Sequence, residues 1–141
     1  MNTVTSTGSM NLLTRLSRVV YRSATEDVIG IRLKQFVLLD YLREQGGSSQ
    51  QQLGETLMLD ANNCVILLND LEESGYVERR RDPTDRRRHI VEMTSAGRLA
   101  LERAEIKLET LEDQVIGNLS PSERSTLRDL LAKSLGCDHS S

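Results

Sequence analysis

Apolar side chains recur three or four residues apart along most of this chain, which is the spacing of one face of an α-helix. This pattern predicts helices over residues 10–24, 31–44, 60–74, 94–116 and 120–135. A further short helix begins at Ser49, where Gln52 completes a capping box. Asp60, Thr94 and Ser120 are favourable N-caps for later helices. The sequence therefore predicts a mostly α protein.

One stretch departs from helical spacing. Two β-prone runs, Tyr76–Arg81 and Arg87–Met93, flank the segment Asp82-Pro83-Thr84-Asp85, whose proline and aspartates favour a turn. This arrangement predicts a β-hairpin. Two short helices joined by a brief turn, with a charged hairpin after the second, are typical of a winged helix-turn-helix. We therefore expect a mostly α fold with a small two- or three-stranded wing.

Positive charge is concentrated in this hairpin. The formal net charge of the chain is −3, yet six of its eighteen Lys and Arg residues lie between Arg79 and Arg88. A hairpin with arginines at its tip fits a groove of double-stranded DNA, because a narrow minor groove attracts inserted Arg. The alternative is a solvated charged hairpin on the protein surface. The charge pattern favours DNA as the partner.

Composition excludes several other classes of protein. The 141 residues suffice for one domain with a core, and no apolar run approaches the ~18 residues of a membrane span. No phosphate loop, Ser/His/Asp set or metal-ligand spacing is present, so we expect neither an enzyme nor a bound metal or cofactor. A cytoplasmic protein with reduced thiols is the default. Residues 1–9 lack the features of a secretory signal and are expected to be a disordered lead-in, with residues 136–141 as a flexible tail.

The helices at both ends of the chain carry apolar stripes outside the helix-turn-helix unit. Such surface favours a dimer, which suits a protein that reads two half-sites of DNA. The alternative is that these helices pack on each other inside a monomer. We expect dimerisation helices over residues 10–30 and 94–135, and a winged helix-turn-helix region over residues 31–93. The residues expected at the dimer interface are Leu12, Leu16, Val19, Leu108, Leu111, Val115, Leu127 and Leu131.

Several motifs together have a recognisable arrangement. They are Gln35-Phe36-Val37-Leu38-Leu39, Leu71-Glu72-Glu73-Ser74-Gly75-Tyr76-Val77-Glu78-Arg79, Asp82-Pro83-Thr84-Asp85-Arg86-Arg87, Met93-Thr94-Ser95-Ala96-Gly97 and Leu119-Ser120-Pro121-Ser122-Glu123. From about residue 10 to 135 the chain resembles the MarR family of bacterial transcriptional regulators. The resemblance implies a homodimer that binds palindromic operators, usually as a repressor. It also implies release of DNA on binding a small anionic or phenolic ligand, or on cysteine oxidation.

The resemblance assigns roles to residues of the wing. Arg87 matches the family's wing arginine that enters the minor groove, and Asp85 matches the carboxylate that holds it. A carboxylate two residues from a guanidinium can fix it by charge-assisted hydrogen bonds. Arg86 and Arg88 are expected to contact phosphates or to be surface charge. Arg79 lies on the first wing strand, where neighbouring side chains alternate between faces, so not every arginine there can meet DNA.

The helix over residues 60–74 matches the family's recognition helix but carries no cation. The candidate base-reading residues are Ala61, Asn62, Asn63 and Ile66. Asn can read adenine and apolar side chains can contact the thymine methyl group, so we expect an A·T-rich operator. The alternative is that the two asparagines only satisfy the helix N-terminus. Further contacts to a phosphate are expected from the backbone N–H groups of Ser49, Gln50 and Gln51.

The input signal is open between two alternatives. The first is a ligand in a cleft between the dimer helices and the winged region, with candidate lining residues Arg15, Tyr21, Phe36 and Tyr41. The second is cysteine oxidation. Cys64 lies on the inward stripe of its helix and is interpreted as a core residue, whereas Cys137 could pair between subunits. A rival to DNA binding is a protein-binding adaptor, which the cation-free recognition helix favours.

Overall fold

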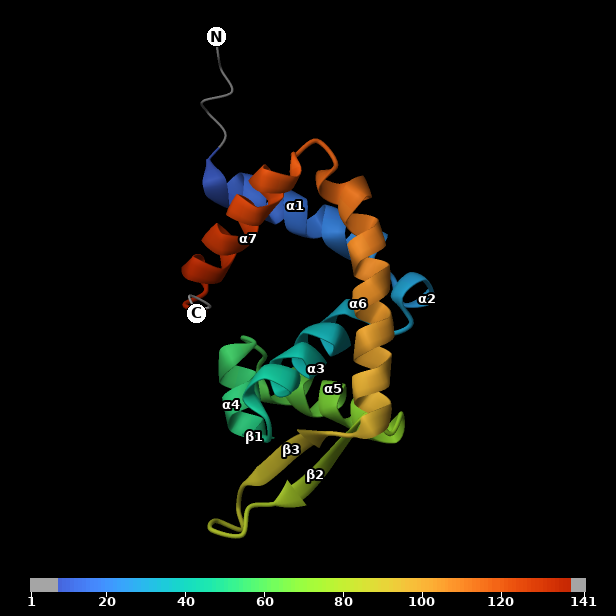
Figure 1. The fold of residues 1–141 in the computed structure, drawn as a ribbon. Coiled ribbons are helices and arrows are strands. Elements are labelled where there is room, and N and C mark those ends of the chain that lie inside the picture. The colour runs from blue at the N-terminus through green and yellow to red at the C-terminus, as the bar shows by residue number, and fades with distance from the viewer. Residues whose placement is uncertain (1–7, 138–141) are drawn as a thin grey trace.

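The computed structural model describes residues 8–137 as a set of helices with one small antiparallel sheet at one end (Figure 1). The helices are α1 (Ser9–Ser23), α2 (Glu26–Ile29), α3 (Leu33–Gln45), α4 (Gln50–Thr56), α5 (Ala61–Glu73), α6 (Ser95–Ile116) and α7 (Pro121–Ser134). The strands are β1 (Ser48–Ser49), β2 (Val77–Arg81) and β3 (His89–Met93). The expected mostly α fold with a small wing is confirmed, and the sheet has three strands.

Helix α2 was not predicted from the sequence. It has four residues, and a single turn is too short to show helical periodicity. Gly30 ends it with a φ of 91°, a left-handed conformation that glycine adopts without steric cost. Ile29 and Ile31 on either side are buried, so this short segment anchors the link between α1 and α3 in the core.

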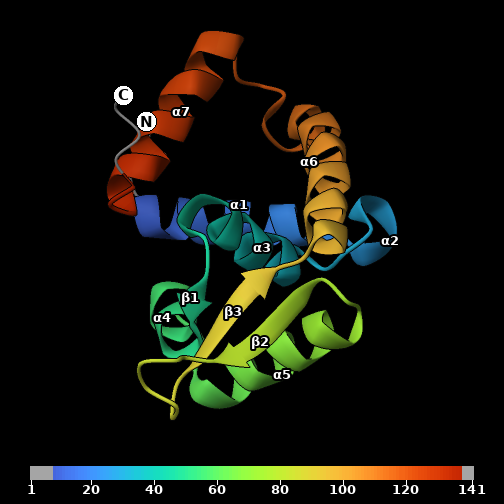
Figure 2. The same cartoon turned by 60° about the horizontal axis from the view of Figure 1, so that its bottom comes forward.

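The long helix α6 connects two parts of the molecule (Figure 1). Near its N-terminal end, α3, α4 and α5 pack with the sheet, and beyond its other end lie α7 and, across from it, α1. Figure 2 shows β3 between β1 and β2, in agreement with the strand order β1-β3-β2. Val77 pairs with Met93 and Arg81 pairs with His89, so residues 82–88 form the tip of the β2–β3 hairpin, which is the wing.

The core lies inside the winged region and against α6 as far as Leu111. Its largest fully buried side chains are Leu38, Leu39, Leu53, Leu68, Leu71, Leu101, Val77 and Val91. The inward stripe predicted for α5 is confirmed, since all its members are buried, namely Cys64, Leu67, Leu68 and Leu71. Because this face of α5 is buried, the opposite face of the same helix is turned toward solvent.

Side-chain caps fix the starts of α4, α5, α6 and α7 at the expected residues. A backbone N–H three residues on donates to each cap, at 3.0, 2.8, 3.0 and 3.2 Å for Ser49, Asp60, Thr94 and Ser120. The side chain of Glu123 also accepts from the Ser120 N–H, which completes a capping box. The box predicted at Ser49 is only half formed, because the side-chain amide of Gln52 donates to Tyr41 Oη at 3.4 Å instead.

The two ends of the chain were expected to lack regular structure. Residues 1–7 and 138–141 lie outside the described part, so this expectation stays untested there. Helix α1 already begins at Ser9, one residue before the predicted start. Within residues 8–137, none of the helices combines the length and apolar character needed to cross a membrane.

Candidate nucleic-acid interface

Backbone and side-chain hydrogen bonds order the tip of the wing. Asp82 N donates to Arg88 O at 2.9 Å, and Arg88 N donates to Asp85 O at 2.9 Å, which closes the loop on itself. The Asp82 carboxylate accepts from the N–H and the hydroxyl of Thr84, at 2.9 and 2.7 Å. These two bonds hold the pKa of Asp82 below its usual value. The arginines of the tip therefore project from a defined loop.

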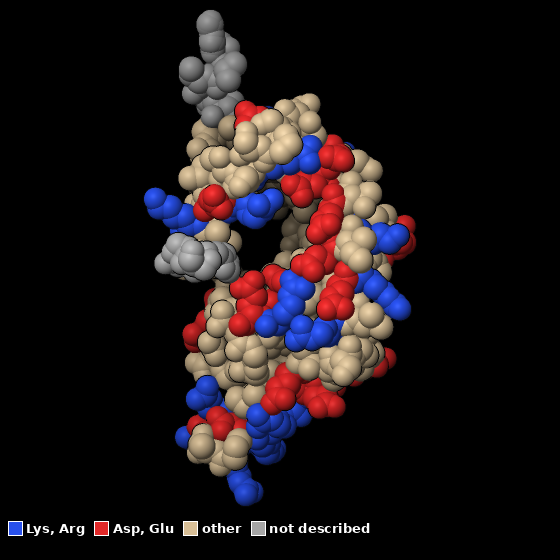
Figure 3. All heavy atoms as spheres, in the orientation of Figure 1, with Lys and Arg blue, Asp and Glu red and all other residues tan. Residues whose placement is uncertain are grey.

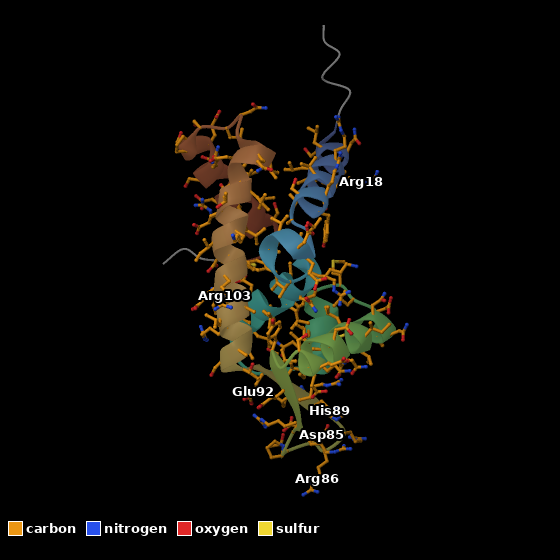
Figure 4. The ribbon with its side chains drawn as sticks, turned by 90° about the vertical axis from the view of Figure 1, so that its right-hand side faces the viewer. Arg18, Asp85, Arg86, His89, Glu92 and Arg103 are labelled. Carbon is orange, nitrogen blue, oxygen red and sulfur yellow. The ribbon has the colours of Figure 1, made fainter. Side chains whose placement is uncertain are left out.

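Arg87 and Asp85 are in contact at this tip. Asp85 Oδ1 accepts from the backbone N of Arg87 at 3.1 Å and from its Nε at 3.4 Å. The Arg87 side chain is nonetheless 93% exposed, so its outer N–H groups face solvent. Figure 4 shows Asp85 at the wing and Arg86 at its outermost point. The geometry is that of a guanidinium held at its base and presented to a partner.

Figure 3 shows Lys and Arg side chains gathered over the wing, whereas acidic side chains follow α6. Arg86, Arg87 and Arg88 are all exposed. Arg81 Nη1 donates to the Arg86 carbonyl at 2.7 Å, which supports the tip from within the wing. Arg80 forms an ion pair with Glu92 across the hairpin at 2.6 Å. The charge available to a partner therefore lies at residues 86–88.

The guanidinium of Arg79 forms hydrogen bonds within the protein. Its Nη2 donates to Asn69 at 2.5 Å and to Glu72 at 2.8 Å, and its side chain is only 19% exposed. The hydrogen bond from Arg79 holds the pKa of Glu72 below its usual value. The geometry favours a brace between the wing and α5 over the predicted DNA contact for Arg79. This contact joins β2 to residues of α5 that lie seven and ten positions earlier in the chain, and it was not predicted from the sequence.

Helix α5 presents its unburied face beside the wing. Ala61, Asn62 and Ile66 are exposed, and Ile66 is half exposed as a large apolar side chain. The side-chain amide of Asn63 donates to Asp60 Oδ2 at 2.8 Å, so Asn63 takes part in the helix cap as the alternative interpretation expected. Asn62 makes no side-chain hydrogen bond to any described residue, which leaves its amide available to a base edge.

A groove of about 430 Å³ separates α4 and α5 from the wing. Its lining residues are Ser49, Gln50, Gln51, Gly54, Glu55, Leu59, Ala61, Cys64, Arg87, Arg88 and His89. Ser49 is buried and its hydroxyl caps α4, so it is a structural residue at the floor of this groove. Gln50 and Gln51 occupy more exposed positions. The groove thus brings together six of the predicted DNA-contacting residues. The others do not line it, namely Asn62, Asn63, Ile66, Arg79, Asp85 and Arg86.

Cys64 lies at the floor of the same groove. It is buried, and its thiol contacts the carbonyl of Gln50 at 3.7 Å. Burial raises the pKa of the Cys64 thiol, which disfavours the reactive thiolate. Cys137 is exposed near the end of the described residues. The geometry of Cys64 therefore favours the core role over a redox role.

The four candidate ligand-lining residues are not brought together. Tyr21 lines a cavity of about 260 Å³ with Lys34, Val37, Leu57, Met58, Leu59 and Leu67. Phe36 and Tyr41 are half-buried against the core, and Arg15 is exposed on α1; none of these three lines that cavity. Met58, in the turn between α4 and α5, has a φ of 58° and is 90% exposed. Of the four predicted ligand-lining residues, only Tyr21 lines this cavity, and its role in ligand binding stays a prediction.

Two cations near α5 were not predicted as site residues from the sequence. Arg32, just before α3, donates to Asp70 of α5 at 2.5 Å, and Lys34 lies two residues further on. Arg32 and Asp70 are 38 residues apart, so no local sequence pattern predicts their contact. The only available signal was the presence of two cations at the start of the first helix of the helix-turn-helix unit.

An arginine-tipped wing beside the exposed face of α5 defines a winged helix-turn-helix fold. The family model described as MarR family matches residues 29–88. Structures with the same fold include MarR itself, at 26% identity and a TM-score of 0.79. The chain belongs to the MarR family of transcriptional regulators.

Similar proteins include named regulators. The chain is 35% identical, over 68% of its length, to a candidate transcriptional regulator of the hcr operon of Thauera aromatica. It is 32% identical, over 74% of its length, to the transcriptional repressor NicR of Pseudomonas putida. These matches cover 58% and 66% of the two relatives, so the chain aligns with less than two thirds of each.

Two similar structures contain DNA. The repressor CouR bound to a 23-mer DNA duplex is 30% identical, covers 89% of this chain and 91% of its own, and has a TM-score of 0.78. A mutant MarR from E. coli in complex with operator DNA is 26% identical, covers 88% of this chain and 91% of its own, and has a TM-score of 0.74.

Proposed function

We propose that this protein is a dimeric repressor that binds a palindromic, A·T-rich operator and is released from it by a small anionic or phenolic ligand. The observation that carries the proposal is the pairing of Arg87 with Asp85 at the wing tip, beside the exposed face of α5. The names of NicR and CouR as repressors, and CouR's complex with DNA, support it.

The terminal helices supply the support for a dimer. No residue of α1 or α7 is buried, although both carry apolar side chains. An apolar cavity of about 230 Å³ lies between α1, α6 and α7, and its lining includes Leu16, Leu108, Leu111, Val115, Leu127 and Leu131. Leu12 is half exposed and Val19 is partly buried on α1. A second copy of the chain would cover this surface.

Base reading is assigned to the first turns of α5. The amide of Asn62 can donate to and accept from an adenine, and Ala61 and Ile66 can contact thymine methyl groups. The wing then places Arg87 in the adjacent minor groove, where A·T-rich sequence is narrow and most negative. Arg86 and Arg88 contact the phosphates beside it.

The cavity around Tyr21 supports the ligand step. It joins α1 to α3, α5 and the turn between α4 and α5, so an occupant would contact both the terminal helices and the helix-turn-helix unit. Its lining is mostly apolar, with the Tyr21 hydroxyl and the Lys34 ammonium as polar groups. Apolar walls with one cation suit an aromatic acid or a phenol.

The test is a fluorescence-anisotropy titration of the full chain against DNA from upstream of its own gene, with unrelated DNA of equal length alongside. Titrations at several salt concentrations measure the contribution of phosphate contacts. Saturable binding that prefers the upstream DNA and weakens steeply with salt supports a regulator. Equal, weak binding to both DNAs contradicts sequence-specific reading and favours the adaptor interpretation.

A further inference from the structure

We infer that Arg32 and Lys34 form a second phosphate-binding site beside α5, on the side of this helix away from the wing. The inference rests on the proposed DNA-binding function and names the contacts that complete it. The recognition helix lacks positive charge, because residues 60–74 contain no Lys or Arg. A recognition helix without cations needs phosphate contacts from its neighbours, since these contacts dominate the affinity for DNA.

Arg32 and Lys34 border the DNA-facing surface of α5. Together with Leu59, Leu67 and Asp70, they line a cavity of about 110 Å³ whose wall also includes Asn63 and Ile66. Ile66 lies on the exposed face assigned to base reading. The two cations therefore stand at the edge of the surface that meets the DNA, although they belong to α3 and the residue before it.

The site and the wing lie on opposite sides of α5. Asn63 and Asp70 are seven residues apart, about two helical turns, so they share one side of the helix. Ala61 and Glu72 are eleven residues apart, about three turns, and share the other side. Ala61 lines the groove against the wing, and Glu72 binds Arg79 of the wing. Asp70 binds Arg32 instead.

This placement matches the shape of the major groove. The groove is about 12 Å wide and accepts one α-helix, so the phosphates of one strand run along each side of that helix. The wing arginines approach one strand. Arg32 and Lys34 are placed to approach the other strand, and the two groups of cations then clamp α5 in the groove.

The side chains of Arg32 and Lys34 both have N–H donors available for a phosphate. The side chains of Arg32 and Asp70 are 50% and 43% exposed, and a guanidinium has five N–H donors, so Asp70 occupies only part of Arg32. Lys34 is exposed and forms no ion pair with the residues that the structure describes. Asp70 holds Arg32 in place but also brings a negative charge toward the incoming phosphate. Lys34 also lines the Tyr21 cavity, so an anion bound there would compete for its ammonium group.

The test compares operator affinity and its salt dependence for Lys34→Ala, Arg32→Ala, Asp70→Asn and the wild type. Arg103→Ala is the matched control, because Arg103 is an exposed cation of α6 away from α5 and the wing (Figure 4). Each of the first two variants is expected to reduce the slope of log K against log salt by about 1. For each of these two variants, the loss of affinity relative to the wild type is then about 3.5-fold larger at about 50 mM than at about 200 mM salt. The loss is expected to be equal on unrelated DNA, because phosphates carry no sequence.

Asp70→Asn separates phosphate binding from a structural role. It breaks the same ion pair as Arg32→Ala, so a structural role for the pair makes both variants weaker. Phosphate binding by a released Arg32 makes Asp70→Asn bind more tightly, with a steeper salt dependence. If Lys34→Ala and Arg32→Ala bind like Arg103→Ala while Arg87→Ala is weakened, the second site is wrong and the proposed function stands. If the wild type does not prefer its upstream DNA, the proposed function is overturned, and the losses of Lys34→Ala and Arg32→Ala on unrelated DNA then decide whether the second site binds phosphates.

Discussion

The guanidinium of Arg43 on α3 donates to both carboxylate oxygens of Glu105 on α6, at 2.9 and 2.6 Å. It also donates to Asp40 of its own helix at 2.5 Å. Helix α6 runs from the wing toward α1 and α7 (Figure 1). A bidentate charged pair is geometrically specific, so this contact fixes how the winged region is mounted on the helix that leads to the proposed dimer interface.

This pair makes stability depend on pH. The hydrogen bond from Arg43 holds the pKa of Glu105 below its usual value. A lowered folded-state pKa stabilises the protein above the unfolded-state pKa, and this contribution is lost as the pH falls through the folded-state pKa. Because the Glu105 side chain is 40% exposed, we expect Glu105→Gln to cost at most about 1 kcal/mol at pH 7. Urea unfolding of both proteins at pH 7 and pH 3 should show this difference shrinking in acid; a difference independent of pH would contradict it.

Gly97 marks a close approach between α6 and the wing. A Cβ added there would lie 2.2 Å from the carbonyl oxygen of Tyr76, a separation that real Cβ atoms essentially never show. Alanine normally favours a helix over glycine by about 1 kcal/mol, so propensity alone predicts stabilisation of Gly97→Ala. We expect the opposite sign, a loss of about 1–3 kcal/mol from overpacking, in denaturant unfolding. A stabilised variant would show that α6 and the chain at Tyr76 can move apart enough to accept the added methyl group.

Asp85→Ala separates the presence of Arg87 from its orientation. The substitution removes the acceptor for the Arg87 backbone N and Nε and leaves the arginine in place. We expect operator affinity to fall by about 1 kcal/mol, the scale of one hydrogen bond, without loss of overall stability. Anisotropy titration measures the first quantity and thermal unfolding the second. Wild-type affinity in this variant would mean that Asp85 does not position Arg87.

Leu131→Glu tests the proposed dimer. Leu131 is 39% exposed and lines the cavity between α1, α6 and α7, so a buried carboxylate at a subunit interface would strongly oppose association. We expect the wild type to sediment as a dimer and Leu131→Glu as a monomer. Ile106→Glu is the control, because Ile106 is a more exposed apolar residue of α6 that lies outside this cavity. Equal sedimentation of all three proteins would place the interface elsewhere.

The sequence was sufficient for features that depend on local spacing. The stripe from Cys64 to Leu71 gave the buried face of α5, and the caps at Asp60 and Ser120 gave helix starts, because both follow from the geometry of a single helix. Family resemblance led to the contact between Asp85 and Arg87, two residues apart in the chain. These features need no knowledge of how distant elements pack.

Features that depend on tertiary packing were missed. Arg79 was expected to face DNA, but folding brings Asn69 and Glu72 of α5 within reach of its guanidinium. Arg32 acquires its position beside the recognition helix from the packing of α3 against α5, which no sequence periodicity encodes. The side chains of long cations reach several partners, and only the fold decides which partner is near.

The most direct test of the account is the affinity of Arg87→Ala for the operator, compared with Arg103→Ala and the wild type at one salt concentration. Minor-groove insertion of Arg87 predicts a loss of about 1–3 kcal/mol, roughly 5- to 150-fold in Kd, with Arg103→Ala unchanged. The loss should be larger on the operator than on unrelated DNA, because the minor groove carries shape that depends on sequence. An unchanged Kd for Arg87→Ala would contradict the role of the wing as the reader of this regulator.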